Sequence, residues 1–549
     1  MSEFDRVPVE PDSLKPGRYF AASYAGEHVA GTEFVIGAMF VAWGVGTIDV
    51  IQGLIIGNAL AVLTWVLVCG PIATDTRLTL YTYLEKITGP GFIKIYSVVN
   101  GILFCVLAGA MITVSASAVR ILFNIPPQVH WYPTDLSFIF VAISVGVVIS
   151  YSAMRGFTFV AQFAEVSAPW MISMFFIGAI ALMPTLVAGT PAVSTINNAA
   201  DLLQLSQLSI WRDMGTEMNV WHVTAIAWGA NLAFHGALGD MTILRFAKKS
   251  SYAWYSAIGM FIGHFAAWLA AGIMGAGAAM LLGKALTSLD AGEVAYQALG
   301  SAGILAVIIA GWTTSNPTIY RAGLAFQSLN PNWSREKVTL AVGVITTIIA
   351  CFPFVFTGLL NYLGIMALVM APTGGIIFAE HYLFKKLDLV RYWREVRDDK
   401  INIPAAVTWI ISVTIAAILS FEFDVHVLFL FVPAWFSAVI IYPVLAKGAG
   451  AGKADRSAAD RLEHTENNRK MNEKAYLLLQ EEANKPPTSM VKLILKILAV
   501  AAIISGFVVA INAYGSGDLE RFKSEIIITT VAYFVVAIIL VIMPEKKAK

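Results

Sequence analysis

Three apolar stretches of this sequence contain ionisable, amide or hydroxyl side chains that could bind a cation and a small polar solute. They read GEHVAGTEFVIGAMFVAWGVG, WHVTAIAWGANLAFHGALGDMTILRF and GILAVIIAGWTTSNPTIYRAGLAFQ. Polar groups and helix-breaking residues are costly at membrane depth, so they usually line a cavity. A helix that loosens there frees backbone carbonyls, and carbonyl and hydroxyl oxygens are the ligands that hard cations such as sodium prefer.

The first stretch places glycines beside its polar residues, which predicts an interrupted helix. Glu27 and His28 come early in the stretch and could lie at the membrane interface. Thr32 and Glu33 follow one to two turns deeper. A carboxylate in a dry site needs a partner, so we expect Glu33 to face a polar cavity.

The second stretch contains Asn231, His235 and Asp240 together with Gly236 and Gly239. Each glycine in a helix interior costs about 1 kcal/mol relative to alanine, so this cluster predicts a second interrupted helix. Two structural alternatives stay open. His235 could be a hydrogen-bonded core histidine, and Asp240 could pair with Arg245 near the end of the helix.

The third stretch contains Thr313, Thr314, Ser315 and Asn316, followed by Pro317, which removes one backbone donor. Hydroxyl groups in membrane helices often bond only to the preceding turn. Alternatively, Thr313 and Thr314 face the loosened carbonyls of the first stretch. That arrangement would supply an oxygen shell for sodium.

The composition is that of a polytopic membrane protein. Of the 549 residues, 58% are hydrophobic and 13% charged, and the mean hydropathy is +0.71. Soluble chains have about 45–50% apolar and about 25% charged residues. The numbers exclude a disordered chain, a coiled coil and an ordinary soluble enzyme. A net charge of +1 produces no positive electrostatic field that would attract nucleic acid. The three cysteines lack the spacing of zinc ligands.

The sequence contains no H-E-x-x-H, G-x-S-x-G or P-loop motif and no repeated filter motif. We therefore expect neither an enzyme nor a channel, and no cofactor. A transporter of a small molecule and a transporter-like receptor remain as interpretations.

A membrane-crossing helix needs about 20 apolar residues, and about fourteen segments meet that requirement. Lysine and arginine concentrate in the loops that connect an even-numbered segment to the next odd-numbered segment. This bias predicts that both termini lie on the cytoplasmic side of a plasma membrane, such as a bacterial inner membrane. The segments are 25–48, 51–73, 93–123, 137–154, 159–186, 220–244, 253–282, 294–326, 338–356, 359–383, 403–420, 425–445, 491–513 and 526–542.

The interrupted segments are the first and the sixth. Interruptions at corresponding positions of two halves indicate a transporter binding site, and halves of five crossings have opposite orientations. The pattern predicts an all-α membrane protein of two inverted five-helix repeats with about four further spans. The predicted divisions are a cytoplasmic tail (1–24), the first repeat (25–187), an extracytoplasmic loop (188–219), the second repeat (220–384), a cytoplasmic loop with two spans (385–447), a charged cytoplasmic connector helix (448–489) and two extra spans with a tail (490–549).

The segments GWTTSNPTIYRAGLAFQ and APTGGIIFAEHYLFKKL resemble the nucleobase–cation symporters of the cytosine permease group, which includes hydantoin, allantoin and purine permeases. IGAMFVAWGVGTIDVIQGLIIGNAL is similar to the first two helices of that family. The resemblance implies a leucine-transporter-type fold and sodium coupling in many members, with protons in some. For sodium it implies the hydroxyls of Thr313 and Thr314 and the backbone carbonyls of Ala310, Glu27 and Gly31.

The resemblance also implies a substrate at the midplane, between spans one, three, six and eight. Ser315-Asn316 stands where cytosine permeases have Asn-Asp, and span three lacks their tryptophan, so cytosine itself is not implied. The expected substrate residues are Thr32, Glu33, Asn100, Phe104, Asn231, Phe234, His235, Ser315 and Asn316.

Two substrate classes remain open. One is a neutral planar amide, such as a nucleobase, ureide or hydantoin-like compound, held by asparagine amides. The other is a small planar cation, such as a guanidinium or amidine compound, held by Glu33 with sodium or proton coupling. The sequence leaves the oligomeric state open between a monomer and a dimer.

Overall fold

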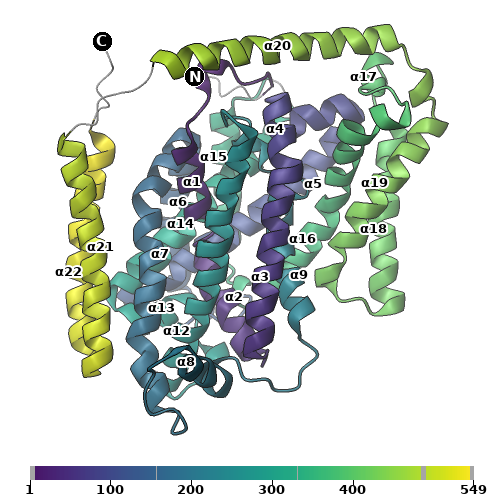
Figure 1. Cartoon of the computed structure of the whole chain (residues 1–549). Coiled ribbons are helices and arrows are strands. Elements are labelled where there is room, and N and C mark those ends of the chain that lie inside the picture. Colours follow the sequence, from purple (N-terminus) through teal and green to yellow (C-terminus); the bar gives the residue numbers. More distant parts are fainter. Residues whose placement is uncertain (1–5, 156, 331, 484–489, 544–549) are drawn as a thin grey trace.

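The computed structural model describes residues 6–155, 157–330, 332–483 and 490–543 and shows a bundle of long helices (Figure 1). Within these ranges no β-strand forms, apart from one isolated bridge between Lys15 and Ala247. Eleven helices in the described chain are long and apolar enough to cross a membrane, which confirms the all-α multi-pass architecture. They are Thr47–Thr76, Leu80–Phe123, Ser137–Met154, Gln162–Ala188, Ser250–Leu282, Ser301–Gln327, Thr357–Leu383, Ile403–Phe423, Val427–Gly448, Met490–Ser516 and Leu519–Ile542.

Three further predicted crossings are built from shorter helices. The first consists of α1 (Gly17–Glu27) and α2 (Gly31–Ala42), and the ninth is α15 (Arg335–Ala350). The sixth consists of α9 (Val220–Gly229), α10 (Leu232–His235) and α11 (Met241–Leu244). Both predicted interruptions are therefore present.

The break in the first crossing lies at residues 28–30. His28 leaves helical geometry at the end of α1, and Ala30 is extended before α2 begins. The helix starts at Gly17, well before the expected start at residue 25. Residues 17–24 therefore belong to the first crossing rather than to the tail. The apolar signal missed them because GRYFAASY is only weakly hydrophobic.

The break in the sixth crossing contains Leu238, whose φ of 67° is rare for a residue with a side chain. The helix α16 (Val355–Phe378) passes directly against this break. A Cβ atom on Gly374 of α16 would collide with the carbonyl oxygen of Gly236. Glycine at position 374 is thus what allows the close approach.

Corresponding helices of the two repeats each contain a π-helical turn. Span two consists of α3 (Thr47–Thr64), a π-turn (Trp65–Cys69) and α4 (Gly70–Thr76), and span seven consists of a π-turn (Ile258–Phe265) and α12 (Ala266–Leu282). The π-turn of span two faces the break of span six, where the rings of Trp65 and His235 lie 4.7 Å apart. The π-turn of span seven faces the break of span one, because Gly263 packs on the His28 backbone. Such turns are frequent at functional sites.

The helix α14 (Ser301–Gln327) lies in the middle of the bundle and is buried along most of its length. It packs against α5 (Leu80–Val119), α6 (Ser137–Met154), α7 (Phe157–Ala188) and α15. The α5 helix kinks at Gly89, where φ is 86°. Short helices connect the crossings: α8 (Ala199–Leu205), α13 (Ala291–Leu299) and α17 (Trp393–Val396).

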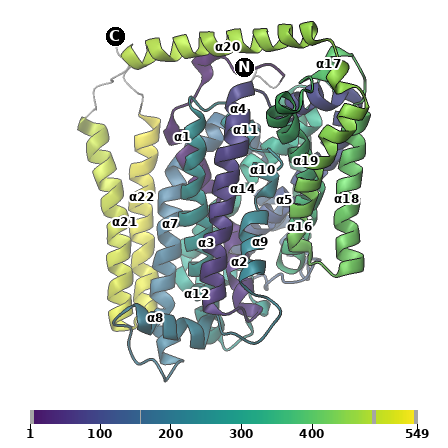
Figure 2. The same cartoon turned by 45° about the vertical axis from the view of Figure 1, so that its right-hand side comes forward.

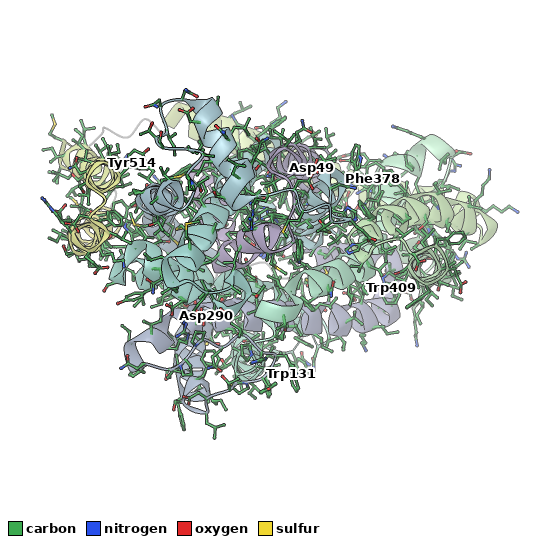
Figure 3. The ribbon with its side chains drawn as sticks, turned by 90° about the horizontal axis from the view of Figure 1, so that it is seen from below. Asp49, Trp131, Asp290, Phe378, Trp409 and Tyr514 are labelled. Carbon is green, nitrogen blue, oxygen red and sulfur yellow. The ribbon has the colours of Figure 1, made fainter. Side chains whose placement is uncertain are left out.

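The remaining helices surround the two repeats. The helices α18 (Ile403–Phe423) and α19 (Phe431–Gly448) pack beside α16, and the hairpin of α21 (Met490–Ser516) and α22 (Leu519–Ile542) packs on α7. Viewed from the end opposite α20, Tyr514 of α21 and Trp409 of α18 lie at opposite sides of the bundle (Figure 3). The predicted connector forms α20 (Arg456–Ala483), which crosses the end of the bundle near which the N-terminal residues lie (Figures 1 and 2).

Candidate functional site

A cluster of oxygen atoms lies where the break of span one meets α14. The Thr314 hydroxyl lies 3.1 Å from the backbone carbonyl oxygen of Glu27 and 3.2 Å from that of Ala310. The Thr313 hydroxyl lies 3.1 Å from the same Ala310 oxygen. Because α1 ends at Glu27, its carbonyl is not committed to the helix. The structure thus brings together four of the five residues predicted for sodium, and we refer to these four oxygens as the oxygen cluster.

Gly31, the fifth residue, begins α2. A Cβ atom on Gly31 would collide with the Val114 side chain and lie 3.3 Å from the Gly311 backbone nitrogen. Glycine is therefore needed for α2 to pack closely on α5 and α14. Participation of the Gly31 carbonyl in ion binding stays a prediction.

A buried ionic triad lies along α14 from the oxygen cluster. The Arg321 guanidinium donates to the Glu27 carboxylate at 2.5 and 3.1 Å and to the Asp240 carboxylate at 2.5 Å. Tyr24 and Trp65 also donate to Asp240, at 3.0 and 2.7 Å. The side chains of Arg321 and Asp240 are each 1% exposed. The triad therefore links the two interrupted crossings through α14.

The triad differs from what the sequence suggested. Arg245 does not pair with Asp240; its side-chain Nε donates to the Thr242 carbonyl at 3.2 Å. Glu27 is buried and not at an interface. Arg321 lies inside α14, which continues to Gln327. A signal existed, because Arg321 follows Thr314 by seven residues, or about two helical turns on the same face.

A second polar cluster surrounds the break of span one. Glu33 Oε1 lies 3.6 Å from His264 Nε2 of span seven, and the Asn231 amide nitrogen lies 3.1 Å from the same His264 atom. The ring of His264 stacks on Trp268 with 4.5 Å between centroids and lies 5.2 Å from His28. These five residues form the polar cluster. His264 and Trp268 were not predicted, although a histidine inside the apolar stretch GHFAAWLAAG is itself a signal.

Several buried polar atoms around this cluster have no hydrogen-bond partner among the described residues. They belong to a carboxylate, two imidazoles and an indole, so they could donate to or accept from a solute. The atoms are Glu33 Oε2, His28 Nε2, Trp268 Nε1 and His235 Nδ1.

The two phenylalanines predicted for the substrate lie near the ionic triad. Phe104 and Phe234 stack with centroids 6.0 Å apart and planes at 16°, and the Arg321 guanidinium lies 4.2 Å above the Phe234 ring. His235 Nε2 donates to the Trp228 carbonyl at 3.0 Å, and the ring packs edge-on against Trp65. Thr32, in the first turn of α2, is buried beside Glu33.

Three predicted substrate residues face elsewhere. The Asn316 amide lies 2.8 Å from the Ser152 hydroxyl of α6. Ser315 donates to the Gly311 carbonyl of its own helix at 2.5 Å. Asn100 donates to the Tyr81 hydroxyl at 3.0 Å, in the part of α5 that contacts Arg321 rather than Glu33. Asn316 follows Thr314 by two positions, which turns it about 200° around α14.

No protein-family model matches the sequence, and a search of curated proteins gives no match. The fold resembles solved transporters. One is Mhp1, a nucleobase-cation-symport-1 family transporter, closed with bromovinylhydantoin bound, with a TM-score of 0.64 and 14% identity over 84% of this chain and 99% of Mhp1. Inward-facing Mhp1 gives a TM-score of 0.59 and 14% identity, covering 82% and 94% of the two chains.

A third solved structure, a sodium-coupled sialic acid symporter in a substrate-bound outward-open state, gives a TM-score of 0.58 and 15% identity. The match covers 79% of this chain and 90% of the symporter. The predicted leucine-transporter-type fold is thereby confirmed. At these identities, the likeness establishes the fold and leaves the activity to be proposed.

Proposed function

We propose that this protein is a secondary active transporter that uses a sodium gradient to import a small planar nitrogen-rich compound. The observation that carries the proposal is the oxygen cluster, in which Thr314 contacts the carbonyls of Glu27 and Ala310 at 3.1 and 3.2 Å. These are hard oxygen ligands at the junction of an interrupted helix and α14. The structural neighbours include a nucleobase-cation-symport-1 family transporter and a sodium-coupled symporter, which supports the same class.

The charges near the oxygen cluster favour a cation. Two buried carboxylates, Glu27 and Asp240, share the single guanidinium of Arg321. An uncompensated charge is expensive in a low-dielectric interior, so an added cation would be stabilised there. Sodium at the Glu27 carbonyl would lie beside this excess negative charge.

The polar cluster suits a flat polar substrate. Its carboxylate, imidazoles and indole N–H provide both donors and acceptors, and unpartnered atoms of Glu33, His28 and Trp268 lie within it. A nucleobase, ureide or hydantoin-like compound presents donors and acceptors along its edge. In this proposal the N-terminal segment before α1 and the connector that contains α20 lie in the cytoplasm, and the protein lies in a plasma membrane, such as a bacterial inner membrane.

A second candidate is import of a small planar cation such as a guanidinium or amidine compound. The unpartnered Oε2 atom of the buried Glu33 favours it, because a carboxylate pairs well with such a cation. Coupling to protons through Glu33 would belong to this candidate. A transporter-like receptor, with α20 as its output, would bind the compound without accumulating it.

The test is uptake by purified protein in lipid vesicles. Labelled nucleobases, ureides and guanidino compounds are supplied with an inward sodium gradient or with choline. We expect sodium-driven accumulation of one class. Thr314→Ala should raise the sodium concentration for half-maximal uptake about 10- to 150-fold, since one contact to a charge is worth about 1.5–3 kcal/mol. Thr357→Ala, which removes an exposed hydroxyl of α16, is the matched control.

Uptake that is independent of the sodium gradient and persists in Thr314→Ala would contradict sodium coupling. Protons would then be the coupling ion, with His235, Glu33 or Asp240 as carriers. Binding without accumulation of any compound would contradict the transporter and support the receptor.

A further inference from the structure

Glu27 contacts α14 at two separate levels. Its backbone carbonyl accepts from the Thr314 hydroxyl in the oxygen cluster, whereas its carboxylate accepts two hydrogen bonds from Arg321. The residue is also the last of α1, directly before the break. A shift of the Glu27 backbone on ion binding would therefore move the carboxylate that Arg321 holds.

Arg321 continues the connection into span six. Its second terminal nitrogen, Nη2, donates to Asp240 at 2.5 Å, and Asp240 is the residue directly before α11. The backbone at this point is unusual, since Leu238 adopts a φ of 67° two residues earlier. Because separating a buried ion pair is strongly unfavourable, Glu27, Arg321 and Asp240 are expected to move together.

A native cysteine contacts span six, so a movement of that span would change the surroundings of its thiol. The Cys69 thiol, at the end of the π-turn of span two, is 3.7 Å from the carbonyl oxygen of Phe234 in α10. Cys69 is buried and is not part of a disulfide. Its reactivity therefore reports the packing of span six against span two.

We propose that Arg321 is a positioning residue that transmits cation occupancy of the oxygen cluster to the break of span six. Ion binding draws the end of α1 toward α14. Arg321 follows the Glu27 carboxylate, and Asp240 follows Arg321. The inference rests on the proposed function, because it requires a cation at the oxygen cluster. It adds the route by which that cation changes the second interrupted helix.

The experiment uses sodium itself as the probe and choline as the ionic-strength control. The full chain is prepared with Cys105→Ala and Cys351→Ala, which leaves Cys69 as the sole thiol. Two quantities are measured against sodium concentration: the melting temperature, which reports ion binding, and the rate of Cys69 alkylation by a maleimide.

Two near-isosteric variants remove one charge on either side of Arg321. Glu27→Gln leaves the backbone carbonyl of the oxygen cluster in place, and Asp240→Asn leaves all of its oxygens untouched. Asp290→Asn is the matched control, because it breaks another buried pair, in which Arg120 donates to Asp290 at 2.7 and 2.8 Å at the far end of α5. If one variant fails to fold, the other decides.

In the parent protein we expect sodium to change the Cys69 alkylation rate about 5-fold or more, the lower range of allosteric coupling. Glu27→Gln and Asp240→Asn each remove one negative charge near the oxygen cluster, so their rise in melting temperature should shift to higher sodium concentration. At a sodium concentration that saturates this rise, both variants should lose most of the alkylation response. Asp290→Asn should keep both. Equal alkylation responses in the parent and both variants would overturn the inference alone. No effect of sodium on the parent's melting temperature would overturn the proposed function and the inference with it.

Discussion

Glu473→Gln is expected to loosen α20 from the end of the bundle. Glu473 accepts from Arg77, the residue that ends α4 in a left-handed conformation with φ of 61°, and from Arg469 at 2.9 Å. Arg77 also donates to the carbonyl oxygens of Arg245 and Ala247, just after α11. One carboxylate thus holds α20 to the ends of both span two and span six.

The free-energy cost of this substitution follows from the burial of the ion pair between Arg77 and Glu473. The side chains of Arg77 and Glu473 are 2% and 11% exposed, and breaking a fully buried pair costs about 3–5 kcal/mol. Arg77 keeps its two carbonyl partners, and glutamine keeps one acceptor oxygen, so we expect about 2 kcal/mol. Burial lowers the pKa of Arg469, and the Glu473 carboxylate opposes that shift. Glutamine would remove this opposition.

The assay is amide hydrogen exchange of α20 in purified protein. A loss of about 2 kcal/mol corresponds to about 30-fold faster exchange in residues 466–480, if exchange follows local opening. Glu463→Gln is the control on the same helix. Its partner Lys385 is 65% exposed, and surface pairs contribute about 0–1 kcal/mol. Unchanged exchange in Glu473→Gln, or equal acceleration in Glu463→Gln, would refute the reasoning.

Two further substitutions test the site and the fold. Glu33→Gln should abolish uptake of a planar cation but only weaken uptake of a neutral base, and unchanged uptake of both would remove Glu33 from the mechanism. Gly374→Ala should lower the melting temperature, because overpacking against the Gly236 carbonyl costs about 1–3 kcal/mol or more. Gly358→Ala in the same helix, whose Cβ meets no atom within 4 Å, should leave it unchanged. Equal melting temperatures for these two variants would contradict the close approach of α16 to the break.

Local features of the sequence were sufficient for the crossings and their interruptions. Apolar length identifies membrane helices because the bilayer sets that length, and glycines beside polar residues mark breaks because both destabilise a continuous helix. The contact of the Thr314 hydroxyl with the Glu27 carbonyl of span one also followed from residue type, since hydroxyls and loosened carbonyls are complementary. The Thr313 hydroxyl instead donates to the Ala310 carbonyl of its own helix. The charged connector was recognisable because its residues favour a solvated helix.

Tertiary structure alone decided which side chains meet. Each residue turns a helix by about 100°, so Asn316 faces α6 whereas Thr314, two positions earlier, faces span one. The partners of Arg321 come from residues far away in the chain, and no local pattern connects Glu27 with Asp240. His264 joins Glu33 because the π-turn of span seven packs against the break of span one. The sequence thus determined where helices form and break, and packing determined what they bring together.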